Sequence, residues 1–112
     1  MDCLFCKIAA GEIPSDCIYE DEKIFAFRDI DPQAPVHFLV IPKVHIESLD
    51  ALKDSDAGLI GHIFTTIRDL AKKEGLTGGY RVVNNIGKDG GQSVAHLHFH
   101  VLGGRSLQWP PG

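Results

Sequence analysis

The sequence predicts an α+β domain built on a five-stranded, mostly antiparallel sheet with one long and one short helix. Three observations support this fold class. Five short segments have the apolar or alternating pattern of strands, one long segment repeats apolar residues at spacings of three and four, and a shorter helical segment opens the chain. Because one long helix separates the third strand from the fourth, we expect an antiparallel meander interrupted at that point.

The first half of the chain is expected to form the short helix and three strands. Residues 4–9 carry apolar positions on one helical face, and Gly11 ends the pattern. Residues 17–20 and 24–29 are predicted strands, and the acidic turn between them indicates a hairpin. Residues 36–41 are almost entirely apolar, which indicates a central, well-buried strand.

The second half is expected to contain the long helix and two further strands. The helix follows the polar residues 54–56, places its apolar side chains on one face over residues 59–71, and ends before Gly75. Residues 80–86 and 96–102 are the two predicted strands, and the glycine-rich loop 87–93 lies between them. Residues 103–112 form a tail.

The size and composition of the chain exclude several classes of protein. Its 112 residues, 44% hydrophobic and 23% charged, suit one compact soluble domain over residues 1–112. No apolar stretch approaches the roughly 18 residues needed to cross a bilayer, and the N-terminus does not resemble a signal peptide, so we expect a cytosolic protein that binds no membrane. A net charge of −4 without a basic cluster argues against a long nucleic acid as partner, although backbone N–H groups can hold a single phosphate.

Three of the six histidines lie within five residues, on the last predicted strand. Side chains alternate along a strand, so His96, His98 and His100 share the face opposite to the apolar residues between them, about 7 Å apart. Imidazoles need polar partners when neutral and repel one another when charged. A solvated, histidine-rich face is the alternative, but such a face ordinarily carries Thr, Lys or Glu.

The glycine-rich loop 87–93 immediately precedes these histidines. Its glycines can turn successive N–H groups toward an anion, although a loop of this composition is more often a flexible turn. A neutral imidazole beside a bound phosphorus centre can attack phosphorus and form a histidyl-phosphoryl intermediate, which water then hydrolyses. A second histidine could orient the first or carry its proton. The pattern therefore favours nucleophilic catalysis at phosphorus.

The three cysteines do not form a disulfide framework, because their number is odd and all lie within the first seventeen residues. Cys3 and Cys6 have the spacing of a zinc-ligand pair, which needs two more ligands; the alternative is that they pack in an amphipathic turn. Cys17 and His62 fit no such group. His62 is on the polar side of the long helix and is predicted to lie on the surface.

Residues 96–102 follow the pattern His-φ-His-φ-His-φ-φ, with φ apolar, and so resemble the histidine triad (HIT) superfamily of nucleotide-binding proteins. Four further segments are similar to its Hint branch, so the resemblance covers nearly the whole chain: residues 29–37, 40–46, 90–93 and 103–112. The resemblance implies a HIT-like fold and a purine nucleoside phosphoramidase. Such an enzyme hydrolyses adenosine 5′-phosphoramidates and aminoacyl adenylates to AMP and an amine through a histidyl-nucleotidyl intermediate.

The same resemblance implies roles for individual residues. His98 would be the nucleophile, His100 and His37 would complete the imidazole cluster, and Ser93 would lie near the leaving amine. Asp29 would accept hydrogen bonds from the ribose hydroxyls. The other expected nucleotide contacts are a phosphate-binding group, an apolar slot for the base and a C-terminal aromatic residue: Asn85, Gly91, Gln92 and Ser93; Leu4, Phe5, Ile8, Ile13, Phe27 and Ile30; and Trp109. Apolar residues of this kind are more often part of the core.

Bacterial-type HIT proteins, which the N-terminus resembles, can hold zinc on a CxxC pair and two histidines. In this sequence the ligands would be Cys3, Cys6, His45 and His96, which would form a closed structural Cys2His2 site. A zinc ion on His96 would make that imidazole unavailable for proton transfer.

The tail indicates a homodimer. Trp109 is a large aromatic residue that is unfavourable on the surface of a monomer, although a disordered end is the alternative. In Hint-like proteins this segment reaches the active site of the partner subunit, and an edge strand can extend the sheet across a two-fold axis.

Three other functions are compatible with these residues. One is hydrolysis of dinucleoside polyphosphates or nucleotidyl transfer, which other HIT branches perform. The second is a nucleotide-binding regulatory or scaffold protein with incidental activity. The third is a zinc carrier, which would need an exchangeable metal.

Overall fold

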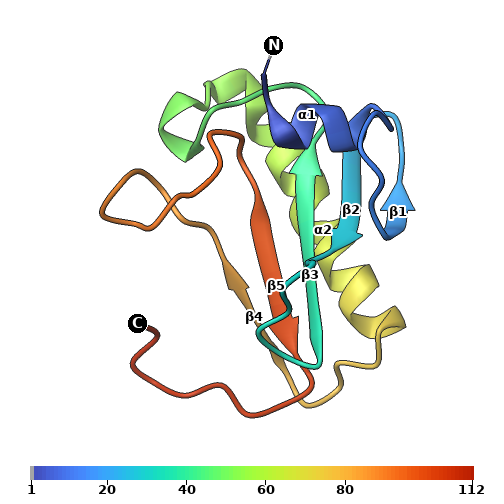
Figure 1. Ribbon diagram of the computed structural model, residues 1–112. Coiled ribbons are helices and arrows are strands. Elements are labelled where there is room, and N and C mark those ends of the chain that lie inside the picture. The colour runs from blue at the N-terminus through green and yellow to red at the C-terminus, as the bar shows by residue number, and fades with distance from the viewer. Residues whose placement is uncertain (1) are drawn as a thin grey trace.

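The structure is a computed structural model that describes residues 2–112 (Figure 1). The helices are α1 (Leu4–Ala9) and α2 (Ala57–Lys73), with short 3-10 turns at Leu49–Ala51 and Asp54–Asp56. The strands are β1 (Cys17–Glu20), β2 (Ile24–Arg28), β3 (Val36–Pro42), β4 (Tyr80–Val83) and β5 (Phe99–Gly103). The predicted α+β class, with five strands, one long helix and one short helix, is confirmed.

The strands form one antiparallel sheet in the order β1-β2-β3-β5-β4. A meander would place β4 beside β3, so that part of the prediction is wrong. Since β5 is antiparallel to both β3 and β4, those two strands run parallel to each other. Parallel strands need a long crossover, which α2 provides, and β5 fills the position between them.

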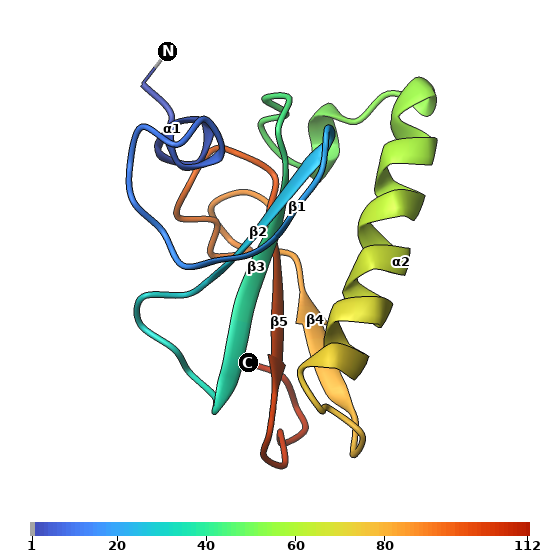
Figure 2. The same ribbon diagram turned by 90° about the vertical axis from the view of Figure 1, so that its right-hand side faces the viewer.

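The two helices cover opposite faces of the sheet (Figure 2). The apolar side of α2 packs on side chains such as Phe38, Phe99 and Val101, which form the larger of two core clusters. On the other face, α1 lies near one end of the sheet and contributes Phe5 and Ile8 to a smaller cluster. The face that carries α1 is therefore less fully covered, and the polar side chains of the site lie on it.

The predicted end of the long helix is confirmed in detail. Gly75 has a φ of +78°, its N–H donates to the carbonyl of Lys72, and the N–H of Leu76 donates to the carbonyl of Ala71. These two bonds form a Schellman motif, which needs a residue that tolerates left-handed backbone. Leu76 is buried at the edge of the core beneath Gly103.

The fourth and fifth strands are shorter than predicted. β4 ends at Val83, and β5 begins at Phe99, so residues 96–98 precede the strand. The reason is that these residues bond to the segment after β3: the Leu97 N–H donates to the carbonyl of Ile46 at 2.7 Å. The predicted alternation persists, because Leu97, Phe99 and Val101 all pack in the larger cluster under α2.

His62 is partly exposed on α2, with 37% of its side chain accessible, and it also has a partner that the sequence does not indicate. Its Nε2 lies 2.7 Å from a carboxylate oxygen of Asp21, which also accepts a hydrogen bond from the Tyr19 hydroxyl. Burial acts to raise the pKa of Asp21, but bonds from the Lys23 N–H, His62, Tyr19 and the Ile24 N–H hold that pKa well below its usual value. The contact joins α2 to the β1–β2 turn.

Neither helix described for residues 2–112 has the length and apolar character that a membrane crossing requires.

Replacement of Phe38 by Ala is expected to destabilise the protein by about 3–5 kcal/mol, because its ring is fully buried between the sheet and α2. Urea denaturation would measure the loss. The matched control is Phe64→Ala: this ring is 46% exposed and contacts Phe99 edge-on, so we expect a loss below about 1.5 kcal/mol. Equal losses in the two variants would contradict the assignment of Phe38 to the core.

Candidate active site

Two neighbouring strands bring His37 and His100 together on the face that carries α1. Leu39 of β3 lies opposite His100 of β5, and His37 lies two residues before Leu39, hence on the same face. The His37 Nε2 and His100 Nδ1 atoms are 2.9 Å apart. The predicted pairing of these two imidazoles is therefore present in the fold.

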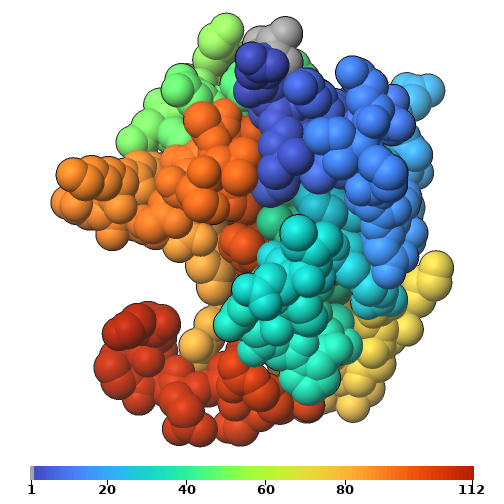
Figure 3. Space-filling model, viewed as in Figure 1, coloured from blue at the N-terminus to red at the C-terminus, as the bar shows by residue number. Residues whose placement is uncertain are grey.

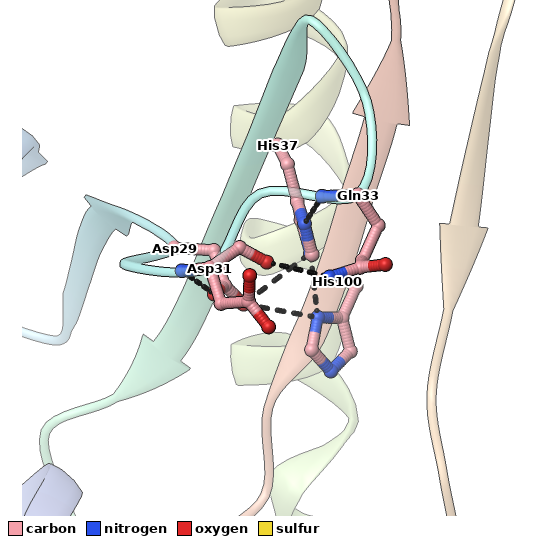
Figure 4. A network of polar contacts seen from close by, with 5 residues as sticks. All are labelled: Asp29, Asp31, Gln33, His37 and His100. Atoms are coloured by element: carbon pink, nitrogen blue, oxygen red, sulfur yellow. Dashed lines mark hydrogen bonds and ion pairs between the residues drawn. The ribbon is translucent and has the colours of Figure 1, made fainter.

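The hydrogen bonds of this pair have a defined direction (Figure 4). The backbone N–H of Gln33 donates to His37 Nδ1 at 3.1 Å, so the proton of a neutral His37 is on Nε2. This Nε2–H can donate to His100 Nδ1, which leaves the proton of a neutral His100 on its own Nε2. The chain of bonds therefore ends in an N–H donor on His100.

Asp29 lies beside this pair. Its Oδ2 is 3.4 Å from His37 Nε2 and 3.9 Å from His100 Nδ1, and its Oδ1 accepts a hydrogen bond from the Asp31 N–H. Asp29, His37 and His100 are also a group that could hold a metal ion. However, the Gln33 N–H places a proton on His37 Nε2, and a protonated nitrogen cannot ligate a metal. This group is therefore best described as a hydrogen-bonded network.

Both imidazoles of the pair are uncharged near neutral pH. Burial, reinforced by the neighbouring imidazoles His98 and His37, lowers the pKa of His100 to about 4, and Asp29 opposes the shift only in part. Burial likewise lowers the pKa of His37 against the opposing effect of Asp29. The neutral forms are those that the directed hydrogen bonds require.

His98 is buried between these imidazoles and α1. Its Nδ1 lies 2.7 Å from the carbonyl oxygen of His96, and because a carbonyl can only accept, Nδ1 carries the proton. The Phe5 ring meets the His98 ring edge-on at 5.0 Å, and the centre of the His100 ring lies 5.1 Å from that of His98. The lone pair of a neutral His98 is therefore on Nε2, the nitrogen that a nucleophile needs.

Three further side chains gather beside His96. Ligand atoms of Cys3, Cys6, His45 and His96 all lie within 4.8 Å of one another, so the group could hold a metal ion. His96 Nδ1 is 3.3 Å from Cys3 Sγ and 3.5 Å from Cys6 Sγ, and His45 Nδ1 is 3.4 Å from Cys6 Sγ. The four predicted ligands are thus brought together from α1, the segment after β3 and the start of the histidine run.

The donor chemistry of this group suits zinc. Metal–ligand distances of about 2.0–2.1 Å for nitrogen and 2.3 Å for sulfur separate neighbouring tetrahedral ligands by roughly 3.3–3.8 Å, which includes the three distances above. His96 Nε2 lies 2.9 Å from the Pro42 carbonyl oxygen and donates to it, so its Nδ1 is unprotonated and faces the thiols. Cys3 also caps α1, because its sulfur accepts from the Cys6 N–H.

The glycine-rich loop is folded more tightly than the sequence suggests. A Cβ on Gly90 would come within 2.2 Å of the Ile86 carbonyl oxygen, and Gly91 has a φ of +78°. The N–H groups of Gly91 and Gln92 bond to carbonyls of the loop itself, and the Gln92 side chain bonds to Gly87, Glu47 and Val94. These groups brace the loop, which differs from the expectation that its N–H groups point freely toward an anion.

Ser93 and Asn85 lie on the two sides of the glycine-rich loop. Ser93 is exposed and lines an open hollow together with Cys3 and His45. Asn85 donates its side-chain N–H to the Gly90 carbonyl at 2.7 Å. Within residues 2–112 no hydrogen bond joins either side chain to His98.

The expected apolar slot is divided between core and surface. Phe5, Ile8, Phe27 and the half-buried Ile13 belong to the smaller core cluster, and Phe5 lies directly on His98. Leu4 is exposed and Ile30 is 99% exposed. Trp109 is also exposed, at 82%.

Sequence reasoning missed Asn84. Its side-chain N–H donates to the backbone carbonyl of His98 at 2.9 Å, from the chain just after β4. Asn84 therefore holds the His98 backbone from the side opposite to β3. Two consecutive asparagines near the end of the predicted strand 80–86 were the available signal, since alternation places one of them on each face of the sheet.

Comparisons with known proteins show the family of this chain. Residues 2–108 match the family model described as scavenger mRNA decapping enzyme C-term binding. An uncharacterized HIT-like protein of Synechococcus elongatus is 55% identical over 111 residues, which cover 99% of this chain and 97% of that protein. The chain belongs to the HIT superfamily.

Solved HIT structures have the same fold as this HIT chain. A HIT family hydrolase from Legionella pneumophila is 53% identical and superimposes with a TM-score of 0.98 over 99% of this chain and 100% of that one. A histidine triad nucleotide-binding protein from Candida albicans is 35% identical, with a TM-score of 0.83 over 97% of this chain and 83% of that one. The predicted superfamily and fold are confirmed.

The low pKa of His100 predicts how the stability of this HIT protein depends on pH. An unfolded histidine titrates near pH 6.5, whereas folded His100 titrates at about 4. Between these values the unfolded chain binds a proton that the folded chain does not. The free energy of unfolding should therefore fall as the pH is lowered through this window.

His100→Asn removes this titration. The free energy of unfolding should then depend less steeply on pH, by up to about 1 kcal/mol per pH unit, as measured by urea denaturation from pH 7 to pH 4. Some slope should remain, because the pKa of His37 is also lowered. Identical slopes in the two proteins would contradict the assignment.

Proposed function

We propose that this protein hydrolyses purine nucleoside 5′-phosphoramidates, including aminoacyl adenylates, to a nucleoside monophosphate and an amine. One observation carries the proposal: His98 Nδ1 donates to the His96 carbonyl, which leaves Nε2 as an unprotonated nitrogen beside two neutral imidazoles. The names of similar proteins, a HIT family hydrolase and a histidine triad nucleotide-binding protein, support hydrolysis of a nucleotide.

In the first step His98 Nε2 attacks the α-phosphorus. A bond forms between Nε2 and phosphorus, and the bond from phosphorus to the amine nitrogen breaks. The amine leaves with the electron pair of that bond and takes up a proton, for which the Ser93 hydroxyl is the proposed nearby donor. The product is a histidyl-nucleotidyl intermediate in which the His98 Nδ1–H still donates a hydrogen bond to the His96 carbonyl.

In the second step a water molecule attacks the same phosphorus. A phosphorus–oxygen bond forms and the bond to Nε2 breaks. The proton of the water passes to the Ser93 oxygen, so that neutral His98, the Ser93 hydroxyl and the nucleoside monophosphate are regenerated. Each step needs stabilisation of negative charge on the phosphoryl oxygens. The His100 Nε2–H is the proposed donor, because the bonds from Gln33 through His37 fix a proton at that position.

The proposed nucleotide contacts follow the family resemblance. Asp29 would accept from the ribose hydroxyls, and Phe5 next to His98 would lie at the inner end of a base-binding surface. The remaining proposed contacts are those of the phosphate loop, the base surface and the tail: Asn85, Gly91, Gln92 and Ser93; Ile13, Phe27 and Ile30; and Trp109.

Zinc is the metal ion that we propose for the cluster of Cys3, Cys6, His45 and His96. The two thiols and two imidazoles complete the four-ligand set of a closed structural site, and the His96 tautomer exposes the nitrogen that would bind. Bound zinc would supply a fixed anchor among α1, the segment after β3 and the start of the histidine run, with no position open to substrate.

A homodimer of the single HIT domain, residues 1–112, is also proposed. β4 is an edge strand whose first residue, Tyr80, is 41% exposed, and a groove beside it is lined by Arg81, Arg105 and Ser106. Figure 3 shows an open recess between the loop after β4 and the tail. Pairing of two β4 edges would extend the sheet and bring the tail, residues 103–112, with its exposed Trp109, to the partner subunit.

The same nucleophile could act on a phosphoanhydride, so dinucleoside polyphosphate hydrolysis and nucleotidyl transfer are the alternatives within catalysis. The non-catalytic alternative is a regulatory or scaffold protein that binds a nucleotide. The intact, directed imidazole network favours catalysis, because a binding site needs no nucleophilic nitrogen with a fixed tautomer.

His98→Asn is expected to lower kcat on a fluorogenic adenosine 5′-phosphoramidate by at least about 10⁴-fold, because no other nitrogen can form the intermediate. The Kd for AMP should change only a few-fold. Single-turnover reactions of the unchanged protein, quenched in base, should yield adenylylated His98 by mass spectrometry. The control is His62→Asn, which lies on α2 and should retain full activity.

Two results would contradict this proposal. Full activity of His98→Asn would remove His98 as the nucleophile, and faster hydrolysis of a diadenosine polyphosphate than of the phosphoramidate would favour the phosphoanhydride alternative. Nucleotide binding without turnover of either substrate would favour the regulatory protein.

The dimer predicts a complex of about twice the chain mass in sedimentation velocity. Tyr80→Lys should shift the protein toward the monomer, because a lysine on an edge strand opposes strand pairing. Cys17→Lys places the same charge on the exposed opposite edge, β1, and should leave the dimer intact. A monomer in the unchanged protein, or dissociation by both variants alike, would contradict pairing through β4.

A further inference from the structure

We propose that the Cys3, Cys6, His45 and His96 cluster, with zinc bound, positions the nucleophile, and that His96 is the residue through which it does so. The proposal rests on the proposed function in one respect, the role of His98. His96 contributes different atoms to the Cys3, Cys6, His45 and His96 cluster and to the surroundings of His98. Its ring faces the thiols, and its backbone carbonyl accepts the hydrogen bond from His98 Nδ1.

The ring of His96 is held on both nitrogens. Nε2 donates to the Pro42 carbonyl at the end of β3, and Nδ1 lies 3.3 Å from Cys3 Sγ and 3.5 Å from Cys6 Sγ. The ring is completely buried. A metal ion bound at Nδ1 would therefore fix the ring between the end of β3 and α1.

Apart from the Asn84 side chain, which donates to the carbonyl of His98, the backbone of residues 96–98 is held by groups beside the cluster. Residues 96–98 precede β5, so the ladder with β3 does not restrain them. The Leu97 N–H bonds to the Ile46 carbonyl, which lies one residue after the ligand His45. The position of the His96 carbonyl consequently depends on groups that belong to the cluster or adjoin it.

The Phe5 ring also connects the cluster to His98 by packing. Phe5 lies between Cys3 and Cys6 in the sequence of α1, and its ring meets His96 at 6.0 Å and His98 at 5.0 Å, edge-on to both. Fixing the two thiols would therefore also fix the ring that packs on His98. Two connections, one through the His96 carbonyl and one through Phe5, join the cluster to the nucleophile.

Loss of the metal should then loosen His98 without removing any group that touches substrate. With the Nδ1 bond to His96 weakened, His98 would exchange between its two tautomers, and the fraction with Nε2 unprotonated would fall. This change affects the chemical step. It leaves the ribose and phosphate contacts unchanged, so kcat should fall while KM stays the same.

The test uses Cys6→Ser, which removes one thiol but keeps the Cys3 sulfur that caps α1. Cys6→Asp restores a side chain that can ligate zinc and serves as the conservative rescue. Cys17→Ser is the matched control, since Cys17 is exposed and outside the cluster. Because the serine variant can fold poorly, the unchanged protein is also stripped with EDTA and titrated with Zn²⁺ alone.

Two measurements are made on each sample besides zinc content. Histidine-labelled protein at one fixed pH gives the ¹⁵N shifts of His98, which report its tautomer. Steady-state kinetics on the fluorogenic phosphoramidate separate kcat from KM. With zinc bound, we expect one His98 tautomer protonated on Nδ1; without zinc, averaged shifts and a kcat lower by about 10- to 100-fold, with KM within twofold. Cys6→Asp and added Zn²⁺ should restore both.

The outcomes separate this proposal from a purely structural metal and from failure of the proposed function. Unchanged His98 shifts and kcat in folded, zinc-free protein would overturn it, even if the melting temperature fell. Failure of the unchanged protein to take up Zn²⁺ would overturn it as well. If zinc shifts the His98 signals but no phosphoramidate is cleaved, the positioning stands and the proposed function fails.

Discussion

The hydrogen bond from the buried His96 ring to the carbonyl of Pro42 is the interaction on which the arrangement of both polar clusters depends. Pro42 has no N–H of its own, so β3 ends here, and its carbonyl is available to a side chain. Burial of an imidazole is unfavourable unless its nitrogens have partners. The Pro42 carbonyl satisfies one nitrogen, which leaves the other directed at the thiols of α1. The His96 ring thereby joins the end of β3 to the thiols beside α1 and to the segment that leads into β5.

The two faces of the sheet tolerate different chemistry for a related reason. Under α2 the core is entirely apolar along β5, and the crossover helix excludes water from it. The other face is covered only at one end by α1, so it combines rings such as Phe5 with polar groups that retain partners. Neutral imidazoles suit this intermediate environment, because burial lowers the pKa of His37 and His100 and so avoids the repulsion of three neighbouring cations.

Local patterns in the sequence predict most of the elements, while the non-local relations are found only in the structure. The alternation of His96, His98 and His100 with apolar residues gives their faces correctly, because it depends only on the geometry of extended backbone. The position of β5 between β3 and β4 depends on pairing across more than fifty residues of chain, which no local pattern contains. The contacts of His62 with Asp21 and of Asn84 with His98 are missed for the same reason. Both join segments that only the folded sheet brings together.

The three histidines of one run differ because their surroundings change along it. His96 is fully buried at the thiols, His98 is nearly buried against Phe5, and the His100 side chain is 22% exposed at the open end. Each also has a different partner on Nδ1: the thiols for His96, a backbone carbonyl for His98, and the His37 N–H for His100. Those partners place the free nitrogen or the remaining proton at different atoms. Three identical side chains at alternate positions therefore differ in which nitrogen is free and which is protonated, and their proposed roles as metal ligand, nucleophile and hydrogen-bond donor rest on these differences.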